Sequence, residues 1–248
     1  MKCKLCNQDK KLLRHSHIIP DFAYKGLYND KHQIAFARFN KPNNKALIPS
    51  APYDKDILCK ECDGNIIGMY ENYGRFVLYG GKQKNDRQIK QTRRTAPDGL
   101  SSLYLENIDY RKFKLYILSI LWKASISKHL LFKNIDLDNH EKIIGNMILN
   151  GDPKDFKTYK TCIVLAEENE KLITGLVSEP RKISGSSTFY VFYINRLFYL
   201  INFSDTNYLE LFDTAGLKED NTMSIPILTG EHLVAFYDSV IGLKLRKE

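Results

Sequence analysis

Cys3-Lys-Leu-Cys6 and Cys59-Lys-Glu-Cys62, two Cys-x2-Cys pairs separated by 52 residues, are the stretches that decide how the first part of this chain folds. Four thiolates in two such pairs suit tetrahedral zinc, because a short turn lets both sulfurs of a pair reach one ion. The long separation is compatible with one site, since the entropy of closing a loop grows only logarithmically with its length. We therefore predict a structural Zn²⁺ held by these four cysteines; four unrelated free thiols are the alternative.

Length and composition indicate a cytoplasmic globular protein. The 248 residues suffice for one large domain or two small ones. The N-terminus lacks the apolar segment of a secretory signal, and the longest apolar run, residues 115–122, is too short to span a bilayer. We expect no membrane partner, and thiols or metal ligands rather than disulfides in a reducing compartment. Cys162 falls in a predicted strand and is interpreted as a small buried hydrophobic residue.

The net charge of +8 is unevenly distributed along the chain. Residues 1–95 hold 19 Lys and Arg against 9 Asp and Glu, a net of +10, whereas residues 96–248 hold 18 against 20, a net of −2. A basic segment beside a neutral one indicates a polyanion partner, most simply nucleic acid. A solubility charge spread over exposed faces is the alternative.

Periodicity predicts a helix from about Glu61 to Leu78, which Gly80 and Gly81 end. The polar segment 81–99 follows, and we expect it to be a basic linker or arm between a module at 1–80 and a domain at 100–248. Its candidate nucleic-acid contacts are Lys82, Lys84, Arg87, Lys90, Arg93 and Arg94. A solvated charge run is the alternative.

Residues 100–248 predict a domain of helices and a mainly antiparallel sheet, so the fold class of the chain is α+β. The stretch from Asp109 is apolar nearly all round and predicts a buried helix, and a second helix begins at Asp138 or Asn139 and ends at Gly151. Residues 160–204 hold short runs rich in β-branched and aromatic residues, with a hairpin turn at Ile194-Asn-Arg196.

The order of motifs in residues 1–80 resembles the zinc-stapled HNH endonucleases, which are His-Me finger nucleases. The pieces that carry the resemblance are Cys3-Lys-Leu-Cys6, His17-Ile-Ile-Pro20 and Leu58-Cys-Lys-Glu-Cys62. A broader set of bacterial HNH-like proteins is similar also in residues 120–129, ILWKASISKH. The resemblance implies a zinc-bound ββα-metal module and a role in phage defence or restriction.

The resemblance also implies roles for individual residues. His17 stands where the family has its general base, which takes a proton from the water that attacks the phosphorus, and an unperturbed histidine titrates near working pH. Asp63 stands where the helix supplies a metal ligand, and a carboxylate there suits Mg²⁺ or Mn²⁺. As alternatives, His17 is a core histidine and Asp63 only caps a helix.

Three positions depart from the family pattern. Ser16 replaces the acid that usually precedes the base, Asp54 replaces the middle Asn, and Asp63 replaces the final His. Ligands for a catalytic ion must therefore come from other groups. The candidates are His15, Asp54, Asp63, Asn65 and Glu71.

Two functional hypotheses follow from these residues. One is a metal-dependent endonuclease that hydrolyses phosphodiester bonds in DNA. The other is a non-catalytic, zinc-stabilised nucleic-acid-binding module with a decayed HNH site, which Ser16 and Asp63 favour. A protein partner docking on the C-terminal domain is compatible with either.

Overall fold

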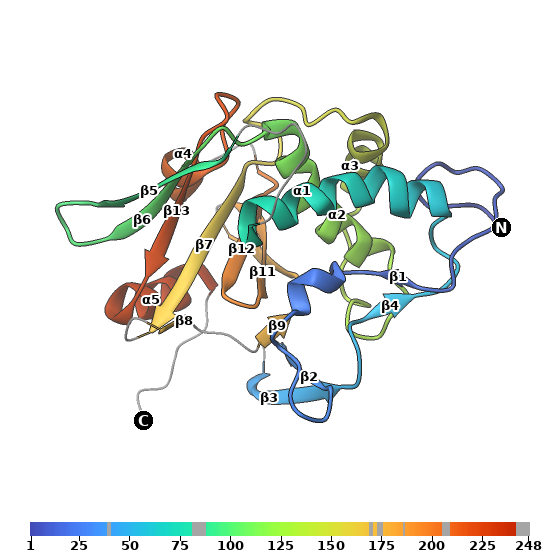
Figure 1. The fold of residues 1–248 in the computed structure, drawn as a ribbon, viewed down its shortest axis with the longest axis horizontal. Coiled ribbons are helices and arrows are strands. Elements are labelled where there is room, and N and C mark those ends of the chain that lie inside the picture. Colours follow the sequence, from blue (N-terminus) through green and yellow to red (C-terminus); the bar gives the residue numbers. More distant parts are fainter. Residues whose placement is uncertain are drawn as a thin grey trace.

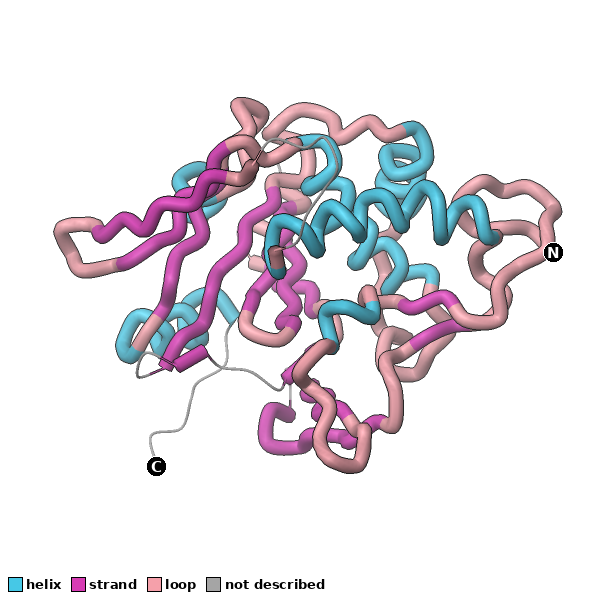
Figure 2. The backbone as a smooth tube through the Cα atoms, in the orientation of Figure 1, coloured by secondary structure: helices cyan, strands magenta, loops and turns pink. Residues whose placement is uncertain are grey.

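A computed structural model describes residues 1–38, 41–80, 88–168, 171–172, 176–185, 187–204 and 209–241. Within these residues eleven strands form one sheet in the order β3-β2-β9-β11-β12-β7-β13-β6-β5, with β10 beside β11 and β8 beside β7. A separate two-stranded ribbon pairs β1 with β4. Figures 1 and 2 show α1, α2 and α3 together on one side of the strands.

The strands and helices have the following bounds. The strands are β1 (Ser16–His17), β2 (Ile34–Arg38), β3 (Lys41–Ile48), β4 (Tyr53–Asp54), β5 (Lys90–Thr95), β6 (Ser101–Glu106), β7 (Thr161–Glu168), β8 (Lys171–Leu172), β9 (Leu176–Ser178), β10 (Arg181–Ser184), β11 (Thr188–Ile194), β12 (Leu197–Asn202) and β13 (Met223–Leu228). The helices are η1 (Asp21–Tyr24), η2 (Glu61–Ile67), α1 (Gly68–Tyr79), α2 (Tyr110–Ile126), α3 (Asn139–Asn150), α4 (Leu211–Ala215), α5 (Gly230–Phe236) and η3 (Tyr237–Ile241).

The central strands are apolar along their length because the sheet is covered on both faces. In β7, Ile163 joins the larger hydrophobic cluster together with residues of α1, α2 and α3, whereas Cys162 and Val164 join the cluster that includes α4 and α5. Successive side chains of a strand point to opposite faces, so a doubly covered strand needs hydrophobic residues at every position. Cys162 is fully buried, as predicted.

The sheet confirms the prediction of a mixed fold with mainly antiparallel pairing. The hairpin turn is confirmed at Asn195 and Arg196, where Asn195 has a φ of 62°, and β11 and β12 pair on either side of it. Two pairs are parallel, β2 with β9 and β13 with β7. None of the helices in the described part of the chain is long and apolar enough to cross a membrane.

The predicted helix at 61–78 is confirmed as η2 followed directly by α1. Its first turns are π-helical, and the left-handed φ of 74° at Gly80 ends it. The Asp109 carboxylate accepts a 2.9 Å bond from the backbone N–H of Lys112 and caps α2. Gly151, in the left-handed region, closes α3. The local signals in the sequence therefore place these helix ends.

The three predicted segments of the chain share one sheet. β2 and β3, from the expected module at 1–80, join the sheet through β9, and buried residues from Cys3 to Ile227 belong to one hydrophobic cluster. The sequence predicts a linker or arm at 81–99, but residues 90–95 form β5 and pair with β6 within the sheet. Lys82, Lys84 and Arg87 lie outside the described residues.

Helix α1 packs closely on α2 at Gly74. A Cβ added there would lie 2.4 Å from the ring of Tyr116, which is fully buried. Gly64, earlier in the same helical run, has nothing within 4 Å of such an atom. The absence of a side chain at Gly74 is therefore what allows the two helices to meet.

Gly74→Ala should destabilise the protein, because overpacking a closed core typically costs about 1–3 kcal/mol. Gly64→Ala, the matched control, should be neutral or stabilising, since alanine favours a helix by about 0.8–1 kcal/mol over glycine. The measurement is the free energy of unfolding in urea for both variants. Equal stability of the two variants would contradict the close α1–α2 contact.

Candidate metal centre

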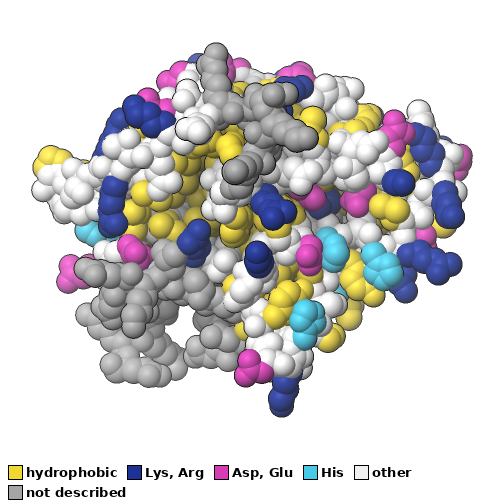
Figure 3. All heavy atoms as spheres, viewed as in Figure 1, with side chains coloured by type: hydrophobic (Ala, Val, Ile, Leu, Met, Phe, Trp, Pro, Cys, Tyr) yellow, Lys and Arg dark blue, Asp and Glu magenta, His cyan; other side chains and the backbone are white. Residues whose placement is uncertain are grey.

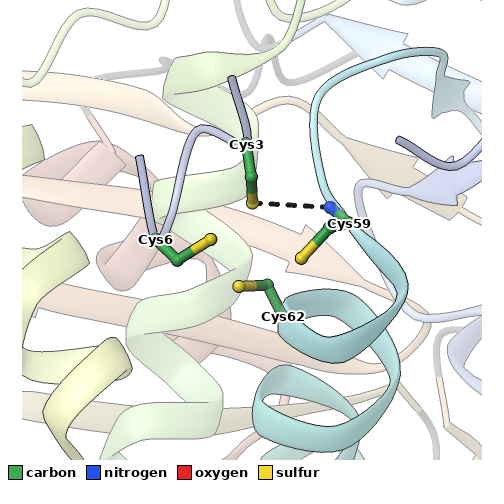
Figure 4. Close-up of side chains that lie close together, drawn as sticks. All are labelled: Cys3, Cys6, Cys59 and Cys62. Carbon is green, nitrogen blue, oxygen red and sulfur yellow. Dashed lines mark hydrogen bonds between the residues drawn. The ribbon is translucent and has the colours of Figure 1, made fainter. Parts of the chain in front are cut away.

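Two chain segments bring the four cysteines together. The backbone N–H of Lys4 donates to the carbonyl of Ile57 at 2.9 Å, and that of Leu13 donates to the carbonyl of Leu58 at 2.8 Å, so the N-terminal loop lies along the chain that leads into η2. The sulfurs of Cys3, Cys6, Cys59 and Cys62 then all lie within 4.8 Å of one another. Figure 4 shows the four side chains pointing toward a common centre.

Hydrogen bonding and burial act differently on these thiols. Burial opposes ionisation of Cys3, but hydrogen bonds from backbone N–H groups outweigh it and lower its pKa to about 7; one of them, from Cys59 N–H, spans 3.4 Å. Burial, and then the neighbouring thiols, raise the pKa of Cys62. Backbone N–H groups directed at a sulfur stabilise a thiolate, the form that binds metal.

The donor set fits zinc. Four thiolates satisfy a closed tetrahedral site and leave no open position for substrate, which is the arrangement of structural rather than catalytic zinc. Zinc with four thiolates carries a net negative charge, and exposed Lys4 and Lys60 lie within the two Cys-x2-Cys turns. An ion pair of 2.5 Å between Lys10 and Glu61 ties the N-terminal loop to the same helix start. The four-cysteine cluster is thus the expected metal site.

The β1–β4 ribbon lies beside the start of the helix. Ser16 pairs with Asp54 and His17 with Tyr53. The Ser16 hydroxyl donates to Asp63 Oδ1 at 2.7 Å, and this contact joins the strand to the residue that follows Cys62. The structure therefore brings Ser16 and Asp63, the two departures nearest the expected base, into direct contact.

His17 is half-buried, and its ring contacts that of Tyr53 with centroids 6.4 Å apart. His15 is exposed and lies closer to the same ring, at 4.5 Å. Ser16, between the two histidines, is fully buried. The histidines thus share one face of the short strand with Tyr53, and a partly open imidazole is present at the position where a general base is expected.

Two other predicted metal ligands, Asp54 and Glu71, already contact donor groups of the protein itself. Asp54 Oδ2 accepts hydrogen bonds from the Ser127 hydroxyl at 2.5 Å and from the backbone N–H of Lys128 at 2.8 Å. Glu71 forms an ion pair with Lys123, whose side chain is 2% exposed. Both partners lie in the segment 120–129, which also belongs to the sequence resemblance, so this segment contacts the module directly. Asn65 is exposed on η2.

Of the residues that the structure describes, the four cysteines alone form a group of three or more His, Cys, Asp or Glu ligands. Among the described residues, the ligands predicted for a catalytic Mg²⁺ or Mn²⁺ do not form a cluster of three or more. Sequence reasoning did not foresee the roles of Ser127 and Lys123, because the pairing partners lie 73 and 52 residues away along the chain.

The described basic residues of the segment 81–99 lie on β5, at the far end of the molecule from β1 and β4 (Figure 1). Lys90 forms an ion pair of 3.1 Å with Glu106, and Arg94 stacks on Tyr104 at 3.4 Å from the ring centroid. Figure 3 shows Lys and Arg side chains near both ends of the visible face. A nucleic acid that contacted β5 and the ribbon together would have to extend along the molecule.

No family model, curated protein or solved structure matches this chain at the level that would assign it to a family.

We expect Cys59→Ala to lose bound zinc and to lower the melting temperature sharply, because metal binding in such a module is coupled to folding. Cys162→Ala makes the same substitution at a buried cysteine outside the cluster and should retain about one zinc per chain. Elemental analysis of protein purified without chelator, with thermal unfolding, gives both readouts. Equal zinc in the two variants would contradict the site.

Proposed function

We propose that this protein is a divalent-metal-dependent endonuclease of the HNH type that hydrolyses phosphodiester bonds in DNA. The observation that carries the proposal is the 2.7 Å contact between Ser16 and Asp63. It places the strand of His17 against the helix residue that follows Cys62, with the four-cysteine cluster behind both. Two strands and a helix stapled by zinc are the arrangement that the sequence resemblance implies.

The chemistry assigned to these residues is simple. His17 accepts a proton from the attacking water, since imidazole is the side chain most often used as a general base. Asp63 would hold Mg²⁺ or Mn²⁺, which when bound stabilises charge on the phosphate. One protein carboxylate can suffice as a ligand, since Mg²⁺ keeps several waters and takes further ligands from substrate phosphates.

The contacts between the module and segment 120–129 support a single working unit. The buried Lys123 fixes Glu71 of α1, and Ser127 fixes Asp54 of β4. Glu71 lies on the helix that carries Asp63, and Asp54 lies on the ribbon that carries His17. The C-terminal part of the chain therefore holds the helix and the ribbon in position. A role in phage defence or restriction, with a protein partner bound by residues 100–248, extends the same proposal.

The second candidate function is a nucleic-acid-binding module without catalysis. It is favoured by the hydrogen bonds that occupy Asp54 and by the ion pair at Glu71. Within the described ranges, Asp63 also belongs to no group of three or more His, Cys, Asp or Glu ligands. This candidate predicts DNA binding with no cleavage under any divalent ion. A cleavage assay separates the two.

His17→Ala should reduce Mg²⁺- or Mn²⁺-dependent plasmid cleavage by roughly 10²–10⁴, the usual contribution of a general base. Zinc content and DNA affinity should stay unchanged, because the imidazole acts on water and supports neither the fold nor phosphate binding. His232→Ala, an exposed histidine on α5, is the matched control and should cleave normally. Normal cleavage by His17→Ala would remove that residue from the mechanism.

Asp63→Ala should lose cleavage in Mg²⁺ and recover part of it at high Mn²⁺, because weaker ligation is offset by mass action. Asp63→His restores the ligand usual in the family and should remain active. Asp56→Ala, an exposed aspartate before the same helix, is the control. A parent protein that binds DNA but cleaves none with either ion supports the binding-module candidate instead.

DNA affinity should fall steeply with salt, since each phosphate contact releases counterions. The double charge reversal Arg93→Glu with Arg94→Glu should flatten the log–log slope by roughly one for each phosphate that is no longer neutralised. Lys142→Glu with Lys157→Glu makes the same charge change at exposed lysines of the neutral half and should leave the slope nearly unchanged. Fluorescence anisotropy at several salt concentrations measures it; equal slopes would mean that β5 makes no phosphate contacts.

A further inference from the structure

A cavity of about 590 Å³ lies beside the ribbon, between the chain around β4 and the segment that follows α2. Pro49, Pro52 and Ile48 line one wall, and Leu130 lines the wall contributed by the other segment. Its volume falls within the range of roughly 300–1,000 Å³ typical of ligand sites. Most of the lining is apolar, and Lys55 and Lys128 also contribute to it.

The cavity is directly connected to the proposed catalytic strand through Tyr53. This residue lines the cavity, pairs with His17 across the ribbon and contacts the rings of His15 and His17. The backbone N–H of Ile18 also donates to the carbonyl of Pro52 at 3.1 Å. A group held in the cavity therefore lies one side chain away from the His17 ring. Figure 3 shows histidine side chains beside hydrophobic atoms at the lower right of the visible face.

Leu130 makes this surface unusual, because it is 74% exposed and stands at the cavity wall. Water around an exposed leucine is released when an apolar or aromatic face covers it. Pro49 is exposed too. Apolar walls and one aromatic ring are suited to covering the π-face of a planar group.

Two lysines and one carboxylate are among the residues that line the cavity. Asp54 Oδ2 accepts hydrogen bonds from two neutral donors, the Ser127 hydroxyl and the Lys128 N–H, so the excess of positive charge rests on the two lysines. Lys55 and the Lys128 side chain are exposed, and no ion pair to either is found within the described residues. His129 accepts at Nδ1 from Leu131 N–H, which leaves Nε2 to carry the proton of the neutral ring. Apolar walls, a tyrosine ring and two exposed lysines together complement a base between two phosphates.

We propose that this cavity binds an unstacked nucleobase of single-stranded DNA, with the flanking phosphates on Lys55 and Lys128. The inference rests on the proposed nuclease function and names its substrate as single-stranded DNA in place of an intact duplex. Bases within a duplex are stacked on both faces and offer none to Tyr53 or Leu130. A base held here would lie across the Tyr53 ring from His17.

The test is a binding assay that needs no cleavage. Fluorescein-labelled oligothymidine, the same chain built with abasic sugars, and a duplex of equal length are titrated in buffer without added Mg²⁺ or Mn²⁺. Leu130→Glu is compared with Leu47→Glu, which places the same charge on a 57% exposed leucine next to Ile48 but outside the cavity. Both sites are exposed, so both variants should fold, and circular dichroism with zinc content verifies this.

The parent should bind oligothymidine about tenfold more tightly than the abasic chain, the size of effect expected for stacking of a base. Leu130→Glu should remove that preference, and Leu47→Glu should keep it. An equal affinity of the parent for thymidine and abasic chains, preferential binding of the duplex, or equal effects of the two variants would overturn the proposal. Base-dependent binding without any metal-dependent cleavage would uphold the cavity and refute the nuclease, whereas cleavage without base-dependent binding would do the reverse.

Discussion

The convergence of four thiols from residues 3–6 and 59–62 is the constraint on which the proposed site depends. The β1–β4 ribbon holds only two residues in each strand, and such a ribbon is not stable alone in water. It forms because the N-terminal loop is fixed against the chain before η2 by backbone bonds and by the sulfur cluster. Without that attachment, we expect Ser16 to lose its hydrogen bond to Asp63 and His17 to lose its fixed position beside Tyr53.

A second constraint joins this module to the rest of the protein. The buried Lys123 is paired with Glu71, and removing one partner of such a pair commonly costs about 3–5 kcal/mol because the other charge is left uncompensated. The close contact of Gly74 with Tyr116 lies on the same pair of helices. Both contacts join α1 to α2, and the Ser127–Asp54 hydrogen bond joins the end of α2 to the ribbon.

Local signals in the sequence predicted the helices, the hairpin and the cysteine cluster, because each depends on residues close together or on a chemistry with few alternatives. The pairing of β2 with β9 joins residues more than 130 positions apart, and no local pattern encodes it. The buried Lys123 was hidden inside a helix that is apolar nearly all round. At the candidate site, the sequence indicated which residue types were present, but the partners of Asp54 and Glu71 depend on long-range packing and were not predictable.

The two functions proposed for the site place different demands on Asp54. A divalent-ion ligand must be free to turn toward the phosphate, yet this carboxylate is held by two donors from the segment that also forms a wall of the neighbouring cavity. These hydrogen bonds attach Asp54 to the segment that carries Leu130. The same hydrogen bonds thus weaken the case for Asp54 as a metal ligand and strengthen the case that β4 supports a substrate-binding surface. In the proposed mechanism, His17 and Asp63 therefore carry the chemistry, and Tyr53 lies between the strand of His17 and the proposed base site.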